Sequence, residues 1–195
     1  MAALLLIALF CYLVGGLPTA YLLMKYMTGK DIRTVGSGNS GATNAGRFLG
    51  LPGFATVLLL DALKAYMALT LVQVAASGDA LAMLVATVFV YIGNAYSPFI
   101  HFSGGKGVAT TVGIMLYIFP LWLFCMCLAV FAWLAHTVQR VDVASLGAVA
   151  SAPVLLLVTG YSAYVVLSAL AIAIWVWMRH ARNIAQLIAL YWGKV

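Results

Sequence analysis

Long apolar runs separated by short polar connections make up most of this 195-residue sequence. A membrane-spanning helix needs roughly 20 apolar residues at about 1.5 Å each, and most of the runs reach or approach that length. Continuous runs favour helices over membrane strands, because a helix satisfies its own backbone hydrogen bonds in lipid. The runs fall at about 3–27, 51–74, 80–100, 108–137, 143–159 and 161–178.

The run at 108–137 is too long for one crossing and short for two, so the flanking charges decide its path. Basic residues occur in the first loop, near 101–107, near 138–142 and in the C-terminal tail, whereas the connections near 75–79 and 159–161 carry no Lys or Arg. If basic loops are cytoplasmic, both ends of 108–137 lie inside, and the run crosses twice with a turn near Pro120.

This topology predicts an all-α integral membrane protein of about seven transmembrane helices, with the N-terminus outside and the C-terminus cytoplasmic. Residues 1–195 are expected to form a single polytopic domain. The fourth helix is then short, and short helices are tolerated in a membrane where they pack in protein or line a polar cavity. A re-entrant pair of helices is the alternative for residues 108–137.

Composition supports the membrane assignment. The chain is 66% hydrophobic and 7% charged, whereas a soluble domain carries about 25% charged residues. No basic residue precedes the apolar stretch from Ala2 to Val14, and Lys25 follows it, which is typical of a retained first helix and not of a cleaved signal peptide. The net charge of +6 indicates positive-inside bias and anionic ligands or lipids, and we expect no nucleic-acid partner.

A polar, glycine-rich stretch, VGSGNSGATNAGR, occupies residues 35–47 between two apolar runs. Glycines permit positive φ, so successive backbone N–H groups can converge on an anion, and flanking arginines suit phosphate. The alternative is a flexible connection, which seldom carries so many donors between two arginines. The candidate phosphate-binding residues are Arg33, Gly36, Gly38, Gly41, Thr43, Asn44 and Arg47, and Ser37, Asn39 and Ser40 are further donors.

A second glycine-rich stretch, FSGGKGVATTVG, spans residues 102–113. Gly104, Gly105 and Gly107 surround Lys106, and a helix is expected to begin directly after them, where its N-terminus would attract an anion. The stretch is not a P-loop, because Val108 follows Gly107 where that motif needs Lys. An ordinary turn with one basic residue is the alternative. Two such loops on one membrane face predict sites for two phosphate groups.

Asp61 and Lys64 lie in the middle of the second apolar run, three residues apart and therefore on one helical face. Charges at membrane depth are costly and usually face a polar interior as a pair. The pair is predicted either to form a wall of the polar site or to orient helices, and the sequence leaves both open.

The remaining polar residues give weaker signals. Arg179, His180, Arg182 and Asn183 follow the last apolar run, where a basic tail is common. His101 and His136 have no partner at metal-ligand spacing, and the chain contains only four acidic residues. We therefore expect no metal site.

These motifs resemble those of the bacterial acyl-phosphate:glycerol-3-phosphate acyltransferases, the PlsY family. The first signature corresponds to DIRTVGSGNSGATNAGRFLG at 31–50, the second to SGGKGVAT at 103–110, and the intramembrane Asp-x-x-Lys to DALK at 61–64. RHARNI at 179–184 resembles the third signature. The motifs occur in the family's order over most of the chain, and the first two are highly specific.

The resemblance implies transfer of a fatty acyl group from acyl phosphate to the 1-hydroxyl of glycerol 3-phosphate, giving lysophosphatidic acid and phosphate. It implies a bacterial inner-membrane enzyme with its active site facing the cytoplasm, in contact with membrane lipid and without a cofactor. An enzyme that produces acyl phosphate is a candidate partner. Arg179 and Asn183 join the expected phosphate-binding residues through the third signature.

The sequence departs from the family pattern at several places. Asn94 stands where a His usually follows Gly93, Gly16 replaces a common Ser, the Arg-Tyr-x-Ser stretch is blurred around Arg140, and a closing Gly-x-Glu is absent. A degenerate member that binds without turnover is therefore one alternative function. A transporter of a small organic phosphate is another, although no repeated halves are visible.

The predicted mechanism depends on binding, because no nucleophile–base dyad is visible. One loop would hold glycerol 3-phosphate and the other the acyl phosphate, and orientation alone can supply about 7–11 kcal/mol. Lys106 and Arg47 would offset charge on the leaving phosphate, and Ser37 or Asn39 would serve the oxyanion. The candidate catalytic residues are Ser37, Asn39 and Lys106.

Overall fold

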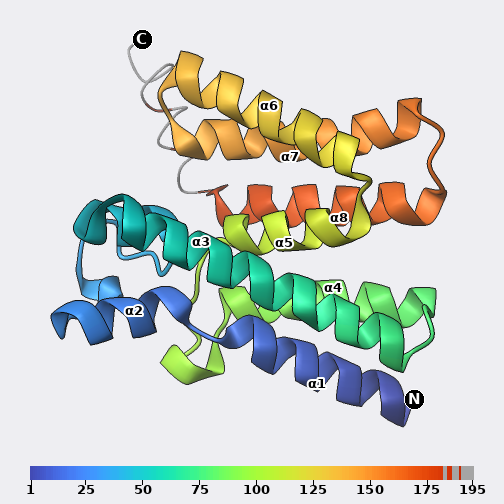
Figure 1. Ribbon diagram of the computed structural model, residues 1–195, viewed down its shortest axis with the longest axis horizontal. Coiled ribbons are helices and arrows are strands. Elements are labelled where there is room, and N and C mark those ends of the chain that lie inside the picture. Colours follow the sequence, from blue (N-terminus) through green and yellow to red (C-terminus); the bar gives the residue numbers. More distant parts are fainter. Residues whose placement is uncertain (182–183, 186–188, 190–195) are drawn as a thin grey trace. The chain divides into compact units, whose positions relative to one another are not determined.

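The computed structural model describes residues 1–181, 184–185 and 189. Within these residues every regular element is a helix, as the apolar runs predict. The chain divides into two compact units, residues 1–117 and 118–195, and each is described by itself (Figure 1).

The first apolar run forms two helices, α1 (Ala2–Gly16) and α2 (Thr19–Thr28), and not the single helix expected over 3–27. Pro18 explains the break, because a proline disfavours helical geometry in the residue before it and lacks an N–H. Leu17 accordingly has ψ 116°. Helix α2 ends at Gly29, whose φ of 71° allows the left-handed cap that closes many helices.

Helix α3 (Ala42–Ala75) begins inside the stretch that the sequence analysis assigned to a loop ending at residue 47. Gly41 caps it, so Thr43, Asn44 and Arg47 belong to its first turns. The helix is kinked at Gly50, which has φ 67°. Polar residues are readily accommodated in a first helical turn, which explains why composition alone placed the boundary too late.

Helices α4 (Ala80–Ala95) and α5 (Val108–Ile118) complete the first unit, joined by the short 3₁₀ helix η2 (Pro98–Ile100). Helix α4 packs against α1 and α3. Gly93 allows the close approach to α1, because a Cβ there would overlap the carbonyl of Tyr12. Gly113 of α5 lies against the carbonyl of Ala62 in α3 in the same way. Small residues at such contacts are typical of membrane helix pairs.

The second unit contains α6 (Leu121–Val138), α7 (Val141–Val158) and α8 (Ala163–Arg179). Helix α7 packs against both of the others (Figure 1). Arg140 and Asp142 form an ion pair of 2.7 Å at the start of α7.

Five helical segments of the described chain are long and apolar enough to cross a membrane, and two shorter apolar helices, Val108–Ile118 and Val165–Arg179, accompany them. The run at 108–137 is interrupted at Phe119–Pro120, between α5 and α6, where the sequence predicts a turn. Helix α5 has only 11 residues, which agrees with the short fourth helix expected. The number of crossings and the orientation of the termini stay predictions.

Candidate functional site

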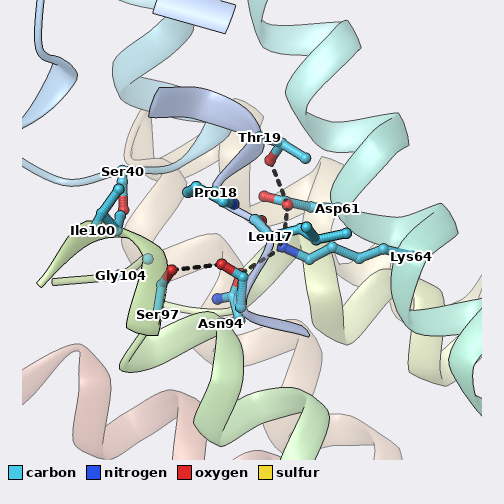
Figure 2. A pocket seen from close by; sticks show the side chains of 12 residues that line it. Leu17, Pro18, Thr19, Ser40, Asp61, Lys64, Asn94, Ser97, Ile100 and Gly104 are labelled. Carbon is cyan, nitrogen blue, oxygen red and sulfur yellow. Dashed lines mark hydrogen bonds and ion pairs between the residues drawn. The ribbon is translucent and has the colours of Figure 1, made fainter. Parts of the chain in front are cut away.

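A small polar cavity lies inside the first unit, where four parts of the chain meet (Figure 2). They are the α1–α2 break, the pair of glycine-rich loops counted as one part, helix α3 and the C-terminal end of α4. The cavity volume is about 10 Å³, close to the minimum for one water molecule. The cavity is lined by Gly16, Leu17, Pro18, Thr19, Ser40, Asp61, Lys64, Asn94, Ser97, Ile100, Gly104 and Gly105.

The intramembrane pair is formed as the sequence predicts, with Lys64 Nζ 2.6 Å from Asp61 Oδ1. Thr19 also donates to Asp61 Oδ1, at 2.6 Å. Lys64 donates further to the Leu17 carbonyl at 2.8 Å and to Asn94 Oδ1 at 3.4 Å. An ammonium has three donors, and Lys64 has three acceptors on α3, the α1–α2 break and α4. The pair therefore both lines the polar cavity and connects these segments, which unites the two alternatives that the sequence left open.

Asn44 organises the first glycine-rich loop from inside α3. Its side chain is buried, donates to the carbonyls of Ile32 and Val35 at 3.1 Å each, and accepts from the Ser37 N–H at 3.0 Å. Gly36 and Gly38 have φ of 57° and 69°, the positive values expected of this loop. The Asn44 side chain and the Ser37 N–H were both predicted to donate to phosphate. In the structure they are hydrogen-bonded to each other and hold the loop in place.

Arg33 joins the first loop to η2. Its guanidinium donates to the Asp31 carboxylate, with a shortest contact of 2.6 Å, and to the Ile100 carbonyl at 2.7 Å, and it lies 5.4 Å from the Tyr21 ring centre. The hydrogen bond from Arg33 lowers the pKa of Asp31 below its ordinary value, against an opposing effect of partial burial. Arg33, a predicted phosphate ligand, is thus already engaged within the protein.

The second glycine-rich loop lies on the end of α4. Gly104 N–H donates to the Ala95 carbonyl at 3.0 Å, and Gly105 N–H to the Asn94 carbonyl at 2.9 Å. A Cβ on Gly104 would overlap the Asn94 carbonyl oxygen, so only glycine fits there. Gly107 has φ 86°, and α5 begins at the next residue, as expected.

The two glycine-rich loops meet at Ser40 and Gly105. Ser40 is buried, and a Cβ on Gly105 would lie 3.1 Å from the Ser40 carbonyl oxygen. The two loops are therefore neighbours within the first unit, and the membrane face on which they lie stays a prediction.

An apolar groove of about 420 Å³ runs between α1 and α3 and reaches the polar cavity. Leu17, Thr19 and Lys64 line both spaces. The other lining residues are apolar, namely Phe10, Val14, Leu60, Leu63, Met67, Ala68 and Leu71. An ion pair and its polar neighbours thus border an apolar groove.

The predicted site residues fall into several groups. Asp61, Lys64, Gly104 and Gly105 line the cavity, and Lys106 and Gly107 continue the second loop beside it. Arg179 ends α8 in the second unit, and Asn183 lies outside the described residues. The residues in or flanking the first loop and in the first turns of α3 are Arg33, Gly36, Ser37, Gly38, Asn39, Gly41, Thr43, Asn44 and Arg47.

Sequence reasoning did not assign a site role to Thr19, Asn94 or Ser97, which all line the cavity. Ser97 donates to the Gly16 carbonyl at 2.5 Å, across the α1–α4 contact. The sequence could have indicated these residues, because each is polar and adjacent to a glycine or proline near the end of an apolar run.

Comparison with known proteins identifies relatives that match most of the chain. The family model described as glycerol-3-phosphate acyltransferase matches residues 5–190. Glycerol-3-phosphate acyltransferase 2 of Moorella thermoacetica is 42% identical over 75% of this chain and 74% of its own length. Glycerol-3-phosphate acyltransferase of Clostridioides difficile is 35% identical over 94% of this chain and 91% of its own length.

Two solved structures share the fold. The crystal structure of PlsY (YgiH), an integral membrane glycerol 3-phosphate acyltransferase, in its glycerol 3-phosphate form superposes with a TM-score of 0.87 at 32% identity, over 96% of this chain and 92% of that one. Its lysophosphatidic acid form gives a TM-score of 0.83 at 30% identity over the same shares.

Proposed function

The chain belongs to the glycerol-3-phosphate acyltransferase family, and we propose that it transfers a fatty acyl group from acyl phosphate to the 1-hydroxyl of glycerol 3-phosphate. The products are lysophosphatidic acid and inorganic phosphate. The names of the relatives support the acceptor, and the solved PlsY structures are described as glycerol 3-phosphate and lysophosphatidic acid forms. Acyl phosphate as donor is consistent with that relationship.

The observation that carries the proposal is the junction between the polar cavity and the apolar groove. Both spaces share Leu17, Thr19 and Lys64, so an amphiphile can place its chain in the groove while its head group lies beside the glycine-rich loops. An acyl phosphate has this division, with a hydrocarbon tail and a phosphorylated carboxyl head. The cavity itself is too small to enclose glycerol 3-phosphate.

The donor needs no further activation, because an acyl phosphate already carries phosphate as a good leaving group. The 1-hydroxyl oxygen attacks the acyl carbonyl carbon, the bond from that carbon to the phosphate oxygen breaks, and phosphate departs. The hydroxyl proton passes to a phosphate oxygen of the substrate. In this proposal, Lys106 and Arg47 offset charge on the leaving phosphate, and Ser37 and Asn39 donate to the oxyanion.

We place the glycine-rich loops at the cytoplasmic face of the bacterial inner membrane. Glycerol 3-phosphate then arrives from water, and acyl phosphate arrives laterally from the bilayer through the groove between α1 and α3. Basic residues in both loops support this orientation, because cytoplasmic loops carry an excess of Lys and Arg.

The test is phosphate release from palmitoyl phosphate by lipid-reconstituted protein, with and without glycerol 3-phosphate. We expect release to depend on the acceptor and to match lysophosphatidic acid formation in amount. Lys106→Ala and Arg47→Ala should each lower turnover about 10- to 100-fold, because each removes a hydrogen bond to a charged group. Lys30→Ala is the matched control, since Lys30 is an exposed basic residue outside both glycine-rich stretches.

Other outcomes would point to the alternative functions. Glycerol 3-phosphate binding without product would indicate a degenerate member of the family. Flux of an organic phosphate across sealed vesicles, without acyl transfer, would indicate a transporter. Full activity of both Lys106→Ala and Arg47→Ala would refute the placement of the leaving phosphate.

A further inference from the structure

Asn94 occupies the point where the intramembrane ion pair meets the second glycine-rich loop (Figure 2). It is the second-last residue of α4, only 8% exposed, and it lines the polar cavity. The charged residues that line the cavity with it are Asp61 and Lys64, and Lys106 follows Gly105 in the loop.

On one side, the Asn94 side chain completes the hydrogen bonding of Lys64. Asp61 and the Leu17 carbonyl take two of the ammonium donors, and Asn94 Oδ1 takes the third. The Lys64 side chain is only 8% exposed, so a donor without an acceptor would be costly there.

On the other side, Asn94 supports the loop that carries Lys106. Its backbone carbonyl accepts from the Gly105 N–H at 2.9 Å. Its Nδ2 lies 3.4 Å from the place where a Cβ on Gly105 would stand, and 3.7 Å from the corresponding place at Gly107. The side-chain amide is therefore packed between Lys64 and the turn of the loop.

We propose that Asn94 is a positioning residue that couples the Asp61–Lys64 pair to the second glycine-rich loop and so sets the orientation of Lys106 toward substrate phosphate. This inference rests on the proposed function. A carboxamide suits the task because its oxygen accepts from Lys64 at every pH and it adds no charge beside the ammonium. An imidazole would accept only while neutral and would repel Lys64 when protonated.

The experiment compares wild type, Asn94→Leu, Asn94→His and the control Thr87→Val as full-length, lipid-reconstituted proteins. Thr87 is a buried polar residue on the same helix that bonds only to the Met83 carbonyl of its own turn among the described contacts. We would measure kcat and KM for glycerol 3-phosphate with palmitoyl phosphate, together with thermal inactivation midpoints, between about pH 6 and about pH 8.

We expect Asn94→Leu to lower kcat/KM about 10-fold, the lower end for a lost hydrogen bond to a charged group, because the contact is long. Asn94→His should approach wild type near pH 8 and lose about 10-fold relative to wild type by about pH 6, as the imidazole becomes charged. Thr87→Val should follow the wild-type pH profile.

A wild-type value of kcat/KM for Asn94→Leu, or a pH profile of Asn94→His parallel to that of wild type, would overturn the inference. A loss by Asn94→His that is independent of pH would do the same, because it would indicate only altered packing. If wild type shows no turnover, the proposed function fails. The pH dependence of glycerol 3-phosphate binding to Asn94→His, measured by calorimetry, then still decides the role of Asn94.

Discussion

Asp61 accepts two short hydrogen bonds, from Thr19 and from Lys64, in a surrounding that offers little water. Breaking a buried ion pair on one side is expensive, because the remaining charge loses its partner, whereas replacing both partners by apolar residues is often tolerated. The stability attributable to this pair therefore depends on both members being present.

We predict that Asp61→Asn and Lys64→Met each destabilise the protein by about 3–5 kcal/mol, and that the double variant Asp61→Leu/Lys64→Met is less destabilised than either. Thermal inactivation in a fixed detergent would measure the order of the three variants. An additive effect in the double variant would contradict this account of the pair.

Asp31 and Arg33 provide a pH prediction at the same scale. Since the hydrogen bond from Arg33 lowers the pKa of Asp31 in the folded protein, the stabilisation is complete above the unfolded pKa of about 3.9 and is lost as pH falls through the lower folded value. The pair is partly exposed, so its contribution is about 0–1 kcal/mol.

We therefore expect Asp31→Asn to lower the thermal midpoint slightly, and by the same amount at every pH between about 6 and 8. The difference from wild type should shrink only below about pH 4. A difference that changes between neutral and mildly alkaline pH would show that another group titrates with this contact.

Helix boundaries mark where sequence reasoning was sufficient and where it was not. The charge pattern predicted the interruption near Pro120, because two basic connections must share one membrane face. The α1–α2 break and the start of α3 at Ala42 were missed. Hydropathy averages over a window, whereas Pro18 acts on one residue, and the Asn44 hydrogen bonds to the preceding loop have no signature in composition.

The same distinction applies to the site. The Asp61–Lys64 pair and the glycine-rich loops were visible in the sequence. Charges at membrane depth and flexible glycines both cost folding free energy, so each pattern indicates a structural or binding role. The contribution of Thr19 and Ser97 depends on how α1, α3 and α4 cross, and crossing is a property of packing between segments distant in the chain.

The second loop yields a prediction from adjacent glycines. A Cβ on Gly104 would overlap a backbone carbonyl, whereas a Cβ on Gly105 would meet its nearest neighbour at 3.1 Å, which a small shift relieves. We expect Gly104→Ala to abolish turnover and to lower stability by about 1–3 kcal/mol. Gly105→Ala should retain measurable turnover; equal losses would show that loop flexibility matters more than packing.

The groove between α1 and α3 predicts selectivity for acyl-chain length. Leu71 lies seven residues from Lys64 along α3, about 10 Å in a helix. Leu71→Trp should lower kcat/KM for palmitoyl phosphate about 10-fold relative to an eight-carbon acyl phosphate, the scale of hydrophobic-pocket discrimination. Leu59→Trp is the control, because Leu59 is exposed on the same helix outside the groove. An equal effect of both variants would place the chain elsewhere.

At the scale of the whole molecule, the acidic residues are few and already engaged. The chain has four: Asp31, Asp61 and Asp142 form ion pairs, and Asp79 caps α4. No group of three metal-ligating side chains occurs among the described residues. We therefore expect turnover to be insensitive to EDTA, and a loss that Mg²⁺ restores would contradict the proposed chemistry.

Topology can be tested across the whole chain by labelling with a membrane-impermeant maleimide. In a cysteine-free background, Ser77→Cys, in the connection without basic residues, should react from outside right-side-out vesicles. Lys30→Cys should react only after permeabilisation. The opposite pattern would invert the orientation and move the glycine-rich loops to the outer face.

The junction at Leu17, Thr19 and Lys64 has a consequence for how the two products leave. In the proposed reaction, one product is a single-chain lipid whose tail is expected to lie in the groove, which is bordered by exposed leucines, and the other is a water-soluble anion released beside the loops. The two products therefore leave into different phases, the lipid sideways into the bilayer and the phosphate into water. Acyl phosphate and glycerol 3-phosphate arrive from these same two phases, so the site is emptied along the two routes by which it is filled.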